Sequence, residues 1–423
     1  MKTFFEKLQL VLHDQVLRKR IFFTLGFLLV SRLLSAVPIP GVDVIQLENF
    51  LSSSQFFGFL NIFSGGGLSN LSIVLLGVGP YITSSIIMQL LTMMSPKLKA
   101  LYHEEGEAGR LRFTQYSRFL TVPLAIIQGL SFLIILERQG VLLPLTTFDF
   151  VVNVVVVVAG SLLLMWIGEL ITEFGIGNGV SLLIFAGIVA GLPSIVQQSI
   201  FLFDVSQIPM YIAFLAAALL IVLGVVVVTE AERPIPVTYA KRVRGAKVYG
   251  GISTYLPLRV NQAGVIPIIF ALSILLLPQM VLNFLQTIPN PLLSSIASVG
   301  LSILSNSWLY AIMYFVFVFL FTYFYTAVTF DPDSISENLQ KSGAFVPGVR
   351  PGQPTSEYLA KVLTRITLVG ALFLGLIAVL PLIVQALTNI ASLAIGGTAL
   401  LIVVSVVLDL IKRIDAQVSM REY

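Results

Sequence analysis

Few residues of this 423-residue chain have the types and spacing that a metal site or an enzyme active site needs. The two histidines, His13 and His103, lie in polar segments, and neither has a second metal ligand at a useful spacing. The chain contains no cysteine, which excludes disulfides, thiolate chemistry and cysteine-based metal sites. We therefore expect no catalytic residues, no metal site and no cofactor.

Two glycine-rich motifs resemble nucleotide-binding loops only superficially. FSGGGLSNLS (63–72) has three consecutive glycines, but it lacks the Gly-x4-Gly-Lys-Ser/Thr pattern of a phosphate loop and has no lysine nearby. GIGNGVS (175–181) lacks the preceding strand and the βαβ context of a dinucleotide-binding fingerprint. We interpret the second motif as a tight turn, whereas composition leaves the role of the first undefined.

Ion-coupled transport requires ionisable side chains inside the membrane, where they are costly and are retained for a purpose. The candidates lie close enough to the ends of apolar segments to snorkel or to cap a helix: Arg32, Glu169, Glu173 and Asp409. None of them is at mid-membrane with an obvious partner. The deeper polar residues are neutral and suit interhelical hydrogen bonds: Gln89, Gln128 and Ser273. The pattern favours a passive conduit over a pump.

The elements that carry these residues are predicted to be membrane-spanning helices, because 57% of the residues are hydrophobic and only 11% are charged. Ten apolar segments are near or above the length of about 18 residues that spans a bilayer: 21–37, 73–94, 117–136, 150–170, 180–199, 210–229, 263–285, 308–329, 366–387 and 391–411. They do not alternate in polarity as barrel strands do. The first segment lacks a cleavage site, so we expect it to be retained.

The basic residues define the orientation of the chain. Of the 25 Lys and Arg residues, 23 fall on one side of the predicted membrane, which the positive-inside rule makes the cytoplasmic side, together with both termini. Two long loops lie on this side. The loop 230–262 suits a short β-hairpin, and the loop 330–361 presents Arg350 between two Pro-Gly pairs. They serve either topology and solubility or the docking of a soluble partner.

The even number of segments permits two five-helix halves, of which the second is inverted relative to the first, with a functional site at their interface. The corresponding divisions are a terminal segment, two halves and a tail: 1–20, 21–199, 200–411 and 412–423. The loop between the fifth and sixth segments lies near the midpoint of the chain, which agrees with this division.

Eight motifs, in their order and spacing, resemble the SecY family of bacterial protein-conducting channels: VPIPG (37–41), NIFSGGGLS (61–69), PYITSSIIMQLL (80–91), EGEAGR (105–110), GIGNGVSLLIFAGIVAGLP (175–193), YAKRVRG (239–245), PLRVNQAGVIPIIFA (257–271) and KSGAFVPGVRPGQPT (341–355). The resemblance covers essentially the whole chain. It implies a non-enzymatic clamshell of two halves around an hourglass pore, through which unfolded polypeptides cross the membrane and apolar helices leave sideways.

The resemblance also implies roles for individual residues. An aliphatic ring that closes the pore by dewetting corresponds to Val78, Ile82, Ile184, Ile269 and Ile402. A weakly held plug corresponds to 56–72 and includes Asn61, Phe63, Ser64, Gly65, Gly66, Gly67 and Leu68. A lateral gate lies between the second and third segments and the seventh and eighth, and we hypothesise that hydrogen bonds of Gln89, Gln128 and Ser273 bias it toward closure.

The long loops become docking sites for the motor ATPase SecA and for ribosomes, through Arg233, Lys241, Arg242, Arg244, Lys247 and Arg350. Expected partners also include SecE, SecG, the signal sequence and the lipid bilayer, in a bacterial cytoplasmic membrane rather than a thylakoid. Val78 replaces the usual isoleucine, and Pro234 and Thr238 replace a basic and an amide residue. A secondary transporter and a scaffold subunit without a pore remain as alternatives.

Overall fold

The structure is a computed structural model that describes residues 13–40, 64, 66–68, 70–103, 105–138, 140–142, 146–201, 208–239, 242–244, 247–249, 253–264, 266–286, 288, 290–388 and 391–419. Ten long helices follow the order of the ten predicted segments: α2 (Gln15–Ser35), α5 (Gly79–Met94), α7 (Gly106–Arg138), α8 (Thr147–Phe174), α9 (Gly179–Phe201), α10 (Ile208–Glu230), α11 (Ile266–Gln286), α13 (Ser307–Thr329), α15 (Gln353–Thr388) and α16 (Ala391–Ser419). Within the described residues, five helices are by themselves long and apolar enough to cross a membrane. The predicted all-α membrane fold is confirmed.

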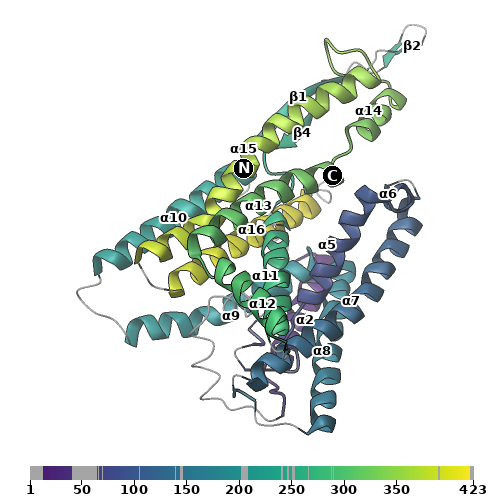
Figure 1. Ribbon diagram of the computed structural model, residues 1–423. Coiled ribbons are helices and arrows are strands. Elements are labelled where there is room, and N and C mark those ends of the chain that lie inside the picture. The colour runs from purple at the N-terminus through teal and green to yellow at the C-terminus, as the bar shows by residue number, and fades with distance from the viewer. Residues whose placement is uncertain are drawn as a thin grey trace.

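Three shorter helices complete the helical part of the described chain: α6 (Pro96–His103), α12 (Pro291–Leu304) and α14 (Pro332–Lys341). The end of the molecule that carries α6, α14 and the strands is called the basic end below. Figure 1 shows α5, α7 and α8 packed together on one side, and α10, α13, α15 and α16 on the other. With α9 counted in the first group and α11 in the second, the two groups meet where α11 packs against α5 and α7, and where α16 packs against α9.

The second predicted segment begins too early. Residues 73–78 form turns, and α5 starts only at Gly79. Gly77 has a φ of +57°, which breaks a helix, and Pro80 occupies the first turn of α5, where a missing N–H costs nothing. The backbone of α8 also presses on this segment, because a Cβ on Gly160 would lie 2.0 Å from the carbonyl oxygen of Ile73.

The two long loops at the basic end join in one sheet. β1 (Glu232–Tyr239) pairs antiparallel with β4 (Ser253–Arg259), which confirms the predicted hairpin, and β2 (Arg242–Arg244) pairs with β3 (Lys247–Tyr249) beyond it. The other loop contributes β5 (Ala344–Phe345), which pairs with β1 at Thr238 and Tyr239. Pro234 lies where β1 has a partner on one side only, a position that tolerates a residue without an N–H.

Candidate pore and docking surfaces

The five predicted ring residues come together in one buried hydrophobic cluster. Their exposed fractions are 2%, 6%, 1%, 5% and 0% for Val78, Ile82, Ile184, Ile269 and Ile402. They come from the turn before α5 and from α5, α9, α11 and α16, which belong to both halves of the chain. The cluster contains many other residues, so the ring itself stays a prediction. The structure places all five at the junction of the two helix groups, with little surface left for water.

The turn that carries Val78 is held by α8. The buried hydroxyl of Ser161 donates a hydrogen bond of 2.8 Å to the carbonyl oxygen of Gly77, and Ile82 N–H bonds to the carbonyl of Val78 at 3.0 Å. Gly160 precedes Ser161 and allows the backbones of α8 and the turn to touch. Ser161 and Gly160 therefore fix the position of Val78 relative to the rest of the cluster.

The predicted plug is described only in part, since Asn61, Phe63 and Gly65 lie outside the described residues. Leu68 and Leu71 are 1% and 0% exposed, in a cluster formed with α7 and α8. Backbone bonds tie this part to the segment after α2: Ile39 N–H to the carbonyl of Leu71, and Ile73 N–H to the carbonyl of Val37, both at 2.9 Å. Leu68 and Leu71 are therefore well packed in this structure, and the weakly held plug stays a prediction.

Arg32 links α2, α9 and the glycine segment. Its Nη2 donates hydrogen bonds of 2.9 Å to the carbonyl oxygens of both Ala186 and Gly187 in α9. A Cβ on Gly66 would lie 3.4 Å from its Nη1. A cavity of about 20 Å³ is lined by Arg32, Ser64 and Val78 among others, so this cation lies next to the predicted ring. Arg32 was expected to snorkel or to cap a helix end, whereas its guanidinium bonds carbonyls in the interior of α9.

A larger cavity of about 220 Å³ opens at the basic end. Its apolar lining includes Leu182, Ile266 and Val406, which are two to four residues from three of the ring residues. Its polar lining includes Asn178 in the GIGNGVS motif, a turn in which Gly177 has a φ of +88°. Further lining residues are Arg259, Asn261, Gln262, Asp409, Lys412 and Arg413. The cavity forms a vestibule with a partly polar lining, on the side of the ring that faces the basic end. The sequence did not predict this cavity; at GIGNGVS it predicted a tight turn.

The three predicted gate residues lie on helices that touch, but no hydrogen bond in the described part joins them to one another. Ser273 is buried on α11, and Gln89 and Gln128 are half-buried on α5 and α7. The side-chain oxygen of Gln89 is buried and accepts no hydrogen bond from any described residue. In this structure, therefore, the side-chain oxygen of Gln89 accepts no hydrogen bond from a described residue that could hold the gate closed.

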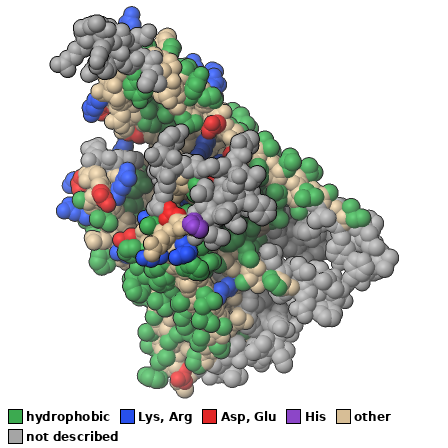
Figure 2. All heavy atoms as spheres, turned by 180° about the vertical axis from the view of Figure 1, so that it is seen from behind, with side chains coloured by type: hydrophobic (Ala, Val, Ile, Leu, Met, Phe, Trp, Pro, Cys, Tyr) green, Lys and Arg blue, Asp and Glu red, His purple; other side chains and the backbone are tan. Residues whose placement is uncertain are grey.

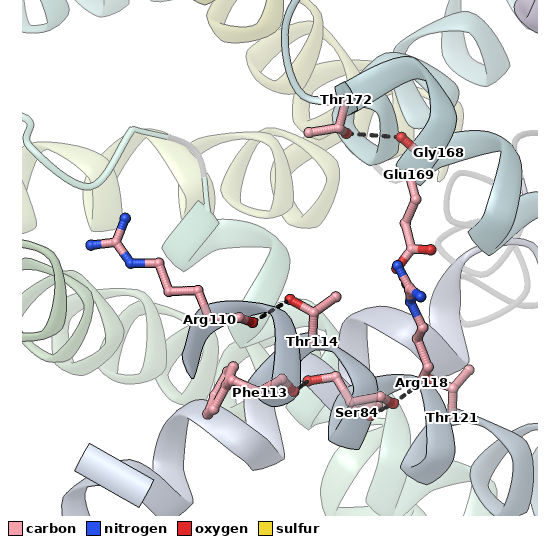
Figure 3. Close-up of polar contacts among 10 residues, drawn as sticks. Ser84, Arg110, Phe113, Thr114, Arg118, Thr121, Gly168, Glu169 and Thr172 are labelled. Atoms are coloured by element: carbon pink, nitrogen blue, oxygen red, sulfur yellow. Dashed lines mark hydrogen bonds and ion pairs between the residues drawn. The ribbon is translucent and has the colours of Figure 1, made fainter. Parts of the chain in front are cut away.

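Polar contacts instead bind α5, α7 and α8 to one another. The hydroxyl of Ser84 donates a hydrogen bond of 2.5 Å to the carbonyl of Ser117, joining α5 to α7. Figure 3 shows Arg118 of α7 and Glu169 of α8 reaching toward each other, with 2.8 Å between Nε and Oε1. Glu169 thus has a partner that the sequence analysis did not find. These contacts make the three helices one unit on their side of the junction.

The strands, the turn with Arg350 and the start of α15 share a separate core at the basic end. Its members include Ile235, Leu258, Val346 and Leu359, which are 1%, 0%, 3% and 0% exposed. Thr355 Oγ1 donates a hydrogen bond of 2.8 Å to the carbonyl of Arg350, whose side chain is exposed. Gly348 and Gly352, with φ of +84° and +95°, form the bends on either side of it. Arg350 is therefore presented on a rigid turn.

The other predicted docking residues are only partly described. Arg233 is exposed on β1, Lys241 lies outside the described residues, and only the backbone of Arg242, Arg244 and Lys247 is described, in β2 and β3. In Figure 2, Lys and Arg side chains gather toward the upper end of the molecule, and hydrophobic side chains dominate the visible surface below them. The basic end thus differs in charge from the apolar band of the helices.

Comparison with known proteins identifies the family. The family model described as SecY matches residues 72–411. The chain is 43% identical to the protein translocase subunit SecY of Mycobacterium tuberculosis, over 96% of each chain. It is 42% identical to that of Corynebacterium glutamicum, over 97% of each chain. The chain belongs to the SecY family.

Solved structures confirm the fold that the family membership implies. "The structure of a protein conducting channel" matches with a TM-score of 0.68 at 18% identity, covering 98% of this chain and 97% of the other. A study of the plug domain of the SecY protein matches with a TM-score of 0.64 at 18% identity, with the same coverage. Canine Sec61 in a ribosome–channel complex matches with 0.63 at 17% identity, covering 96% and 94%. This SecY family member therefore has the ten-helix clamshell fold.

Proposed function

We propose that this SecY family chain is the passive protein-conducting subunit of a translocase, which moves unfolded polypeptides across a membrane and releases apolar segments sideways into lipid. The observation that carries the proposal is the junction of the two helix groups, where buried aliphatic side chains from both halves pack together next to the polar vestibule. Aliphatic side chains exclude ions by dewetting and yield to a polypeptide that passes between them. The proposal assigns no catalytic step to the chain.

The alternative of an ion-coupled transporter finds no support in the buried polar residues. Among the described residues, no Asp, Glu, Lys, Arg or His is buried; the buried polar side chains are Ser, Thr and Asn, with the hydroxyls of Tyr310 and Tyr314. Arg32, which lines a small cavity together with Val78, donates hydrogen bonds to backbone carbonyls of α9, and no acid is buried among the described residues to form a relay with it. The energy for transport is therefore supplied by partners.

The segment around Gly65–Gly67 serves in this proposal as the plug, and Arg32 forms part of its seat. The plug domain of the SecY protein in one matched structure is described as stabilising the closed state and maintaining a membrane seal. In this chain, Gly66 lies against the Arg32 guanidinium, and Ser64 and Val78 line the same small cavity. The seated segment covers the ring from the side away from the vestibule.

The lateral gate lies where α11 meets α5 and α7. The contacts of Ser84 and of Arg118 with Glu169 make α5, α7 and α8 move together, so the opening falls at their boundary with α11. Gln89, Gln128 and Ser273 lie on the helices at this boundary and bias the gate through packing and desolvation rather than through mutual hydrogen bonds. An apolar segment in the pore reaches lipid through this boundary.

The docking surface is the exposed part of the basic end, with Arg350 on its rigid turn and Arg233 on β1. We assign it to a motor ATPase of the SecA type and to ribosomes; canine Sec61 is a relative found in a ribosome–channel complex. SecE and SecG are the further partners. The chain lies in the cytoplasmic membrane of a bacterium, with both termini and the basic end in the cytoplasm.

Crosslinking to a stalled secretory chain tests the pore assignment. A photoreactive amino acid at Ile82 or Ile402 should crosslink the stalled chain in membrane vesicles, because both side chains lie in the predicted ring. The same probe at Leu376 of α15, which is 62% exposed, is the matched control and should crosslink only lipid. If probes at Ile82 and Ile402 give no more product than the probe at Leu376, the path does not run through this cluster.

A further inference from the structure

Helix α12, absent from the sequence-based prediction, connects α11 to α13 at the end opposite the basic end. Asn290 caps its start by accepting a hydrogen bond of 3.0 Å from Leu292 N–H, and Pro291 occupies its first turn. The helix has 14 residues. At 1.5 Å per residue it is roughly 21 Å long, which is too short to cross a hydrocarbon core of about 30 Å.

One face of α12 packs on α11. Ala297 and Leu304 are 0% and 8% exposed on this face. Gly300 brings the helices together so closely that an added Cβ would lie 2.8 Å from a methyl carbon of Leu282 in α11. Figure 1 shows α12 beside α11 and continuing into α13. The helix is therefore fixed to a helix of the gate boundary.

The face next to this one carries an unpartnered aliphatic stripe at helical spacing, between the buried face and the row of serines. Leu292, Ile296, Val299 and Ile303 are 75%, 60%, 56% and 47% exposed. Beside the stripe runs a row of exposed serines, whose hydroxyls bond to the helix backbone: Ser298 to the carbonyl of Ser295 at 2.9 Å, and Ser302 to the carbonyl of Val299 at 2.8 Å. A helix with one wide apolar face and one small polar face matches an interface between water and lipid.

Three observations identify lipid as the occupant of this stripe. The sequence has no charged residue between Arg259 and Asp331, so α12 lacks the charges that a protein-docking loop such as the basic end carries. Exposed apolar side chains continue from α12 onto α13 at Trp308 and Ile312. Trp308 follows two residues after the helix cap Asn306, a position typical of the aromatic belt at a membrane surface.

We propose that α12 lies in the membrane interface at the end opposite the basic end, with its aliphatic stripe in the acyl chains of that leaflet and its serine row toward the headgroups. It anchors the adjoining end of α11, the helix that carries Ile269 and Ser273. The proposal goes beyond the proposed function, because it requires only that the chain spans a membrane. Its test measures depth rather than transport, so failure here leaves the channel assignment intact.

The absence of native cysteine makes a spin-label test clean. Single-cysteine variants Ile296→Cys and Ile303→Cys sample the stripe, and Ser295→Cys and Ser302→Cys sample the serine row of the same helix. Each full-length protein is labelled and reconstituted in phosphatidylcholine vesicles. Power saturation then measures collisions with oxygen, which concentrates in acyl chains, and with a water-soluble nickel chelate.

We expect the ratio of oxygen to nickel collisions to be at least severalfold higher at the two stripe positions than at the two serine positions. Equal ratios, or nickel collisions dominating at the stripe, would mean that the stripe faces water and would overturn the proposal. Low collision rates with both reagents at the stripe would mean that protein covers it, which overturns the proposal equally. All four labelled sites are exposed on the described helix, so labelling does not require repacking.

Discussion

Replacing Gly66 by alanine tests whether the glycine segment seals the pore. Gly66 has a φ of +83°, a left-handed conformation that costs a residue with a side chain about 1–2 kcal/mol. The new Cβ would lie 3.4 Å from Arg32 Nη1, a contact that the long arginine side chain can accommodate. The backbone conformation therefore dominates the cost. A loss of about 1–2 kcal/mol lowers the ratio of seated to unseated segments by roughly 5–30-fold.

Gly67→Ala perturbs the same segment through contact rather than backbone conformation. Its Cβ would lie 2.9 Å from the carbonyl oxygen of Val74 and 2.9 Å from the hydroxyl oxygen of Ser72. The carbonyl belongs to the turn that leads to Val78, so it cannot rotate away as a side chain would. We expect Gly67→Ala to unseat the segment at least as strongly as Gly66→Ala.

The assay is ion efflux from proteoliposomes that contain the complete translocase and no translocating chain. Efflux should be limited by the unseated fraction, so Gly66→Ala should raise the rate by roughly 5–30-fold. Gly26→Ala in α2 is the matched control, because no atom lies within 4 Å of its added Cβ. If Gly66→Ala and Gly67→Ala leak no faster than Gly26→Ala and export normally, the segment does not form the seal.

Three further substitutions have defined expected outcomes. Arg350→Glu should leave the helices folded but abolish SecA-driven export in inverted vesicles, whereas Lys361→Glu, the same charge change at another exposed site of this end, should retain it. Ile402→Ala, at a position 0% exposed, should destabilise the protein by about 2–5 kcal/mol in denaturant titration and increase ion leak through the cavity it leaves. Gln89→Leu removes a buried oxygen without a partner and should stabilise the closed gate by about 1–3 kcal/mol. Export directed by weak signal sequences should therefore fall. A rise in this export would mean that Gln89 holds the gate closed.

Much of the fold follows from hydrophobic segment length, because a helix needs a minimum apolar length to cross a bilayer. The criterion fails where apolar residues are not helical, as at 73–78, where Gly77 and the approach of Gly160 force turns. It fails again where a helix continues beyond the membrane: α15 begins at Gln353, whereas the predicted segment begins at 366. Helix α12 was missed because it is too short to satisfy the same criterion.

The candidate site was predicted less completely than the fold. The resemblance to the SecY family selected five aliphatic residues, and these share one buried cluster. They could not indicate that Arg118 meets Glu169, because the two are 51 residues apart and only the packing of α7 on α8 joins them. Nor could composition predict that Leu68, next to the glycines, is buried, because its burial depends on side chains of α7 and α8.

Helix α15 has a mechanical consequence for the proposed channel. Its 36 residues run without interruption from the core shared with the Arg350 turn to Thr388, on the order of 54 Å at 1.5 Å per residue. Over much of its length it packs on α13, and it also contacts α16, the helix that carries Ile402. A partner that pushes on the Arg350 turn therefore acts on a stiff lever arm, which converts a tilt at the surface into displacement at the depth of the ring.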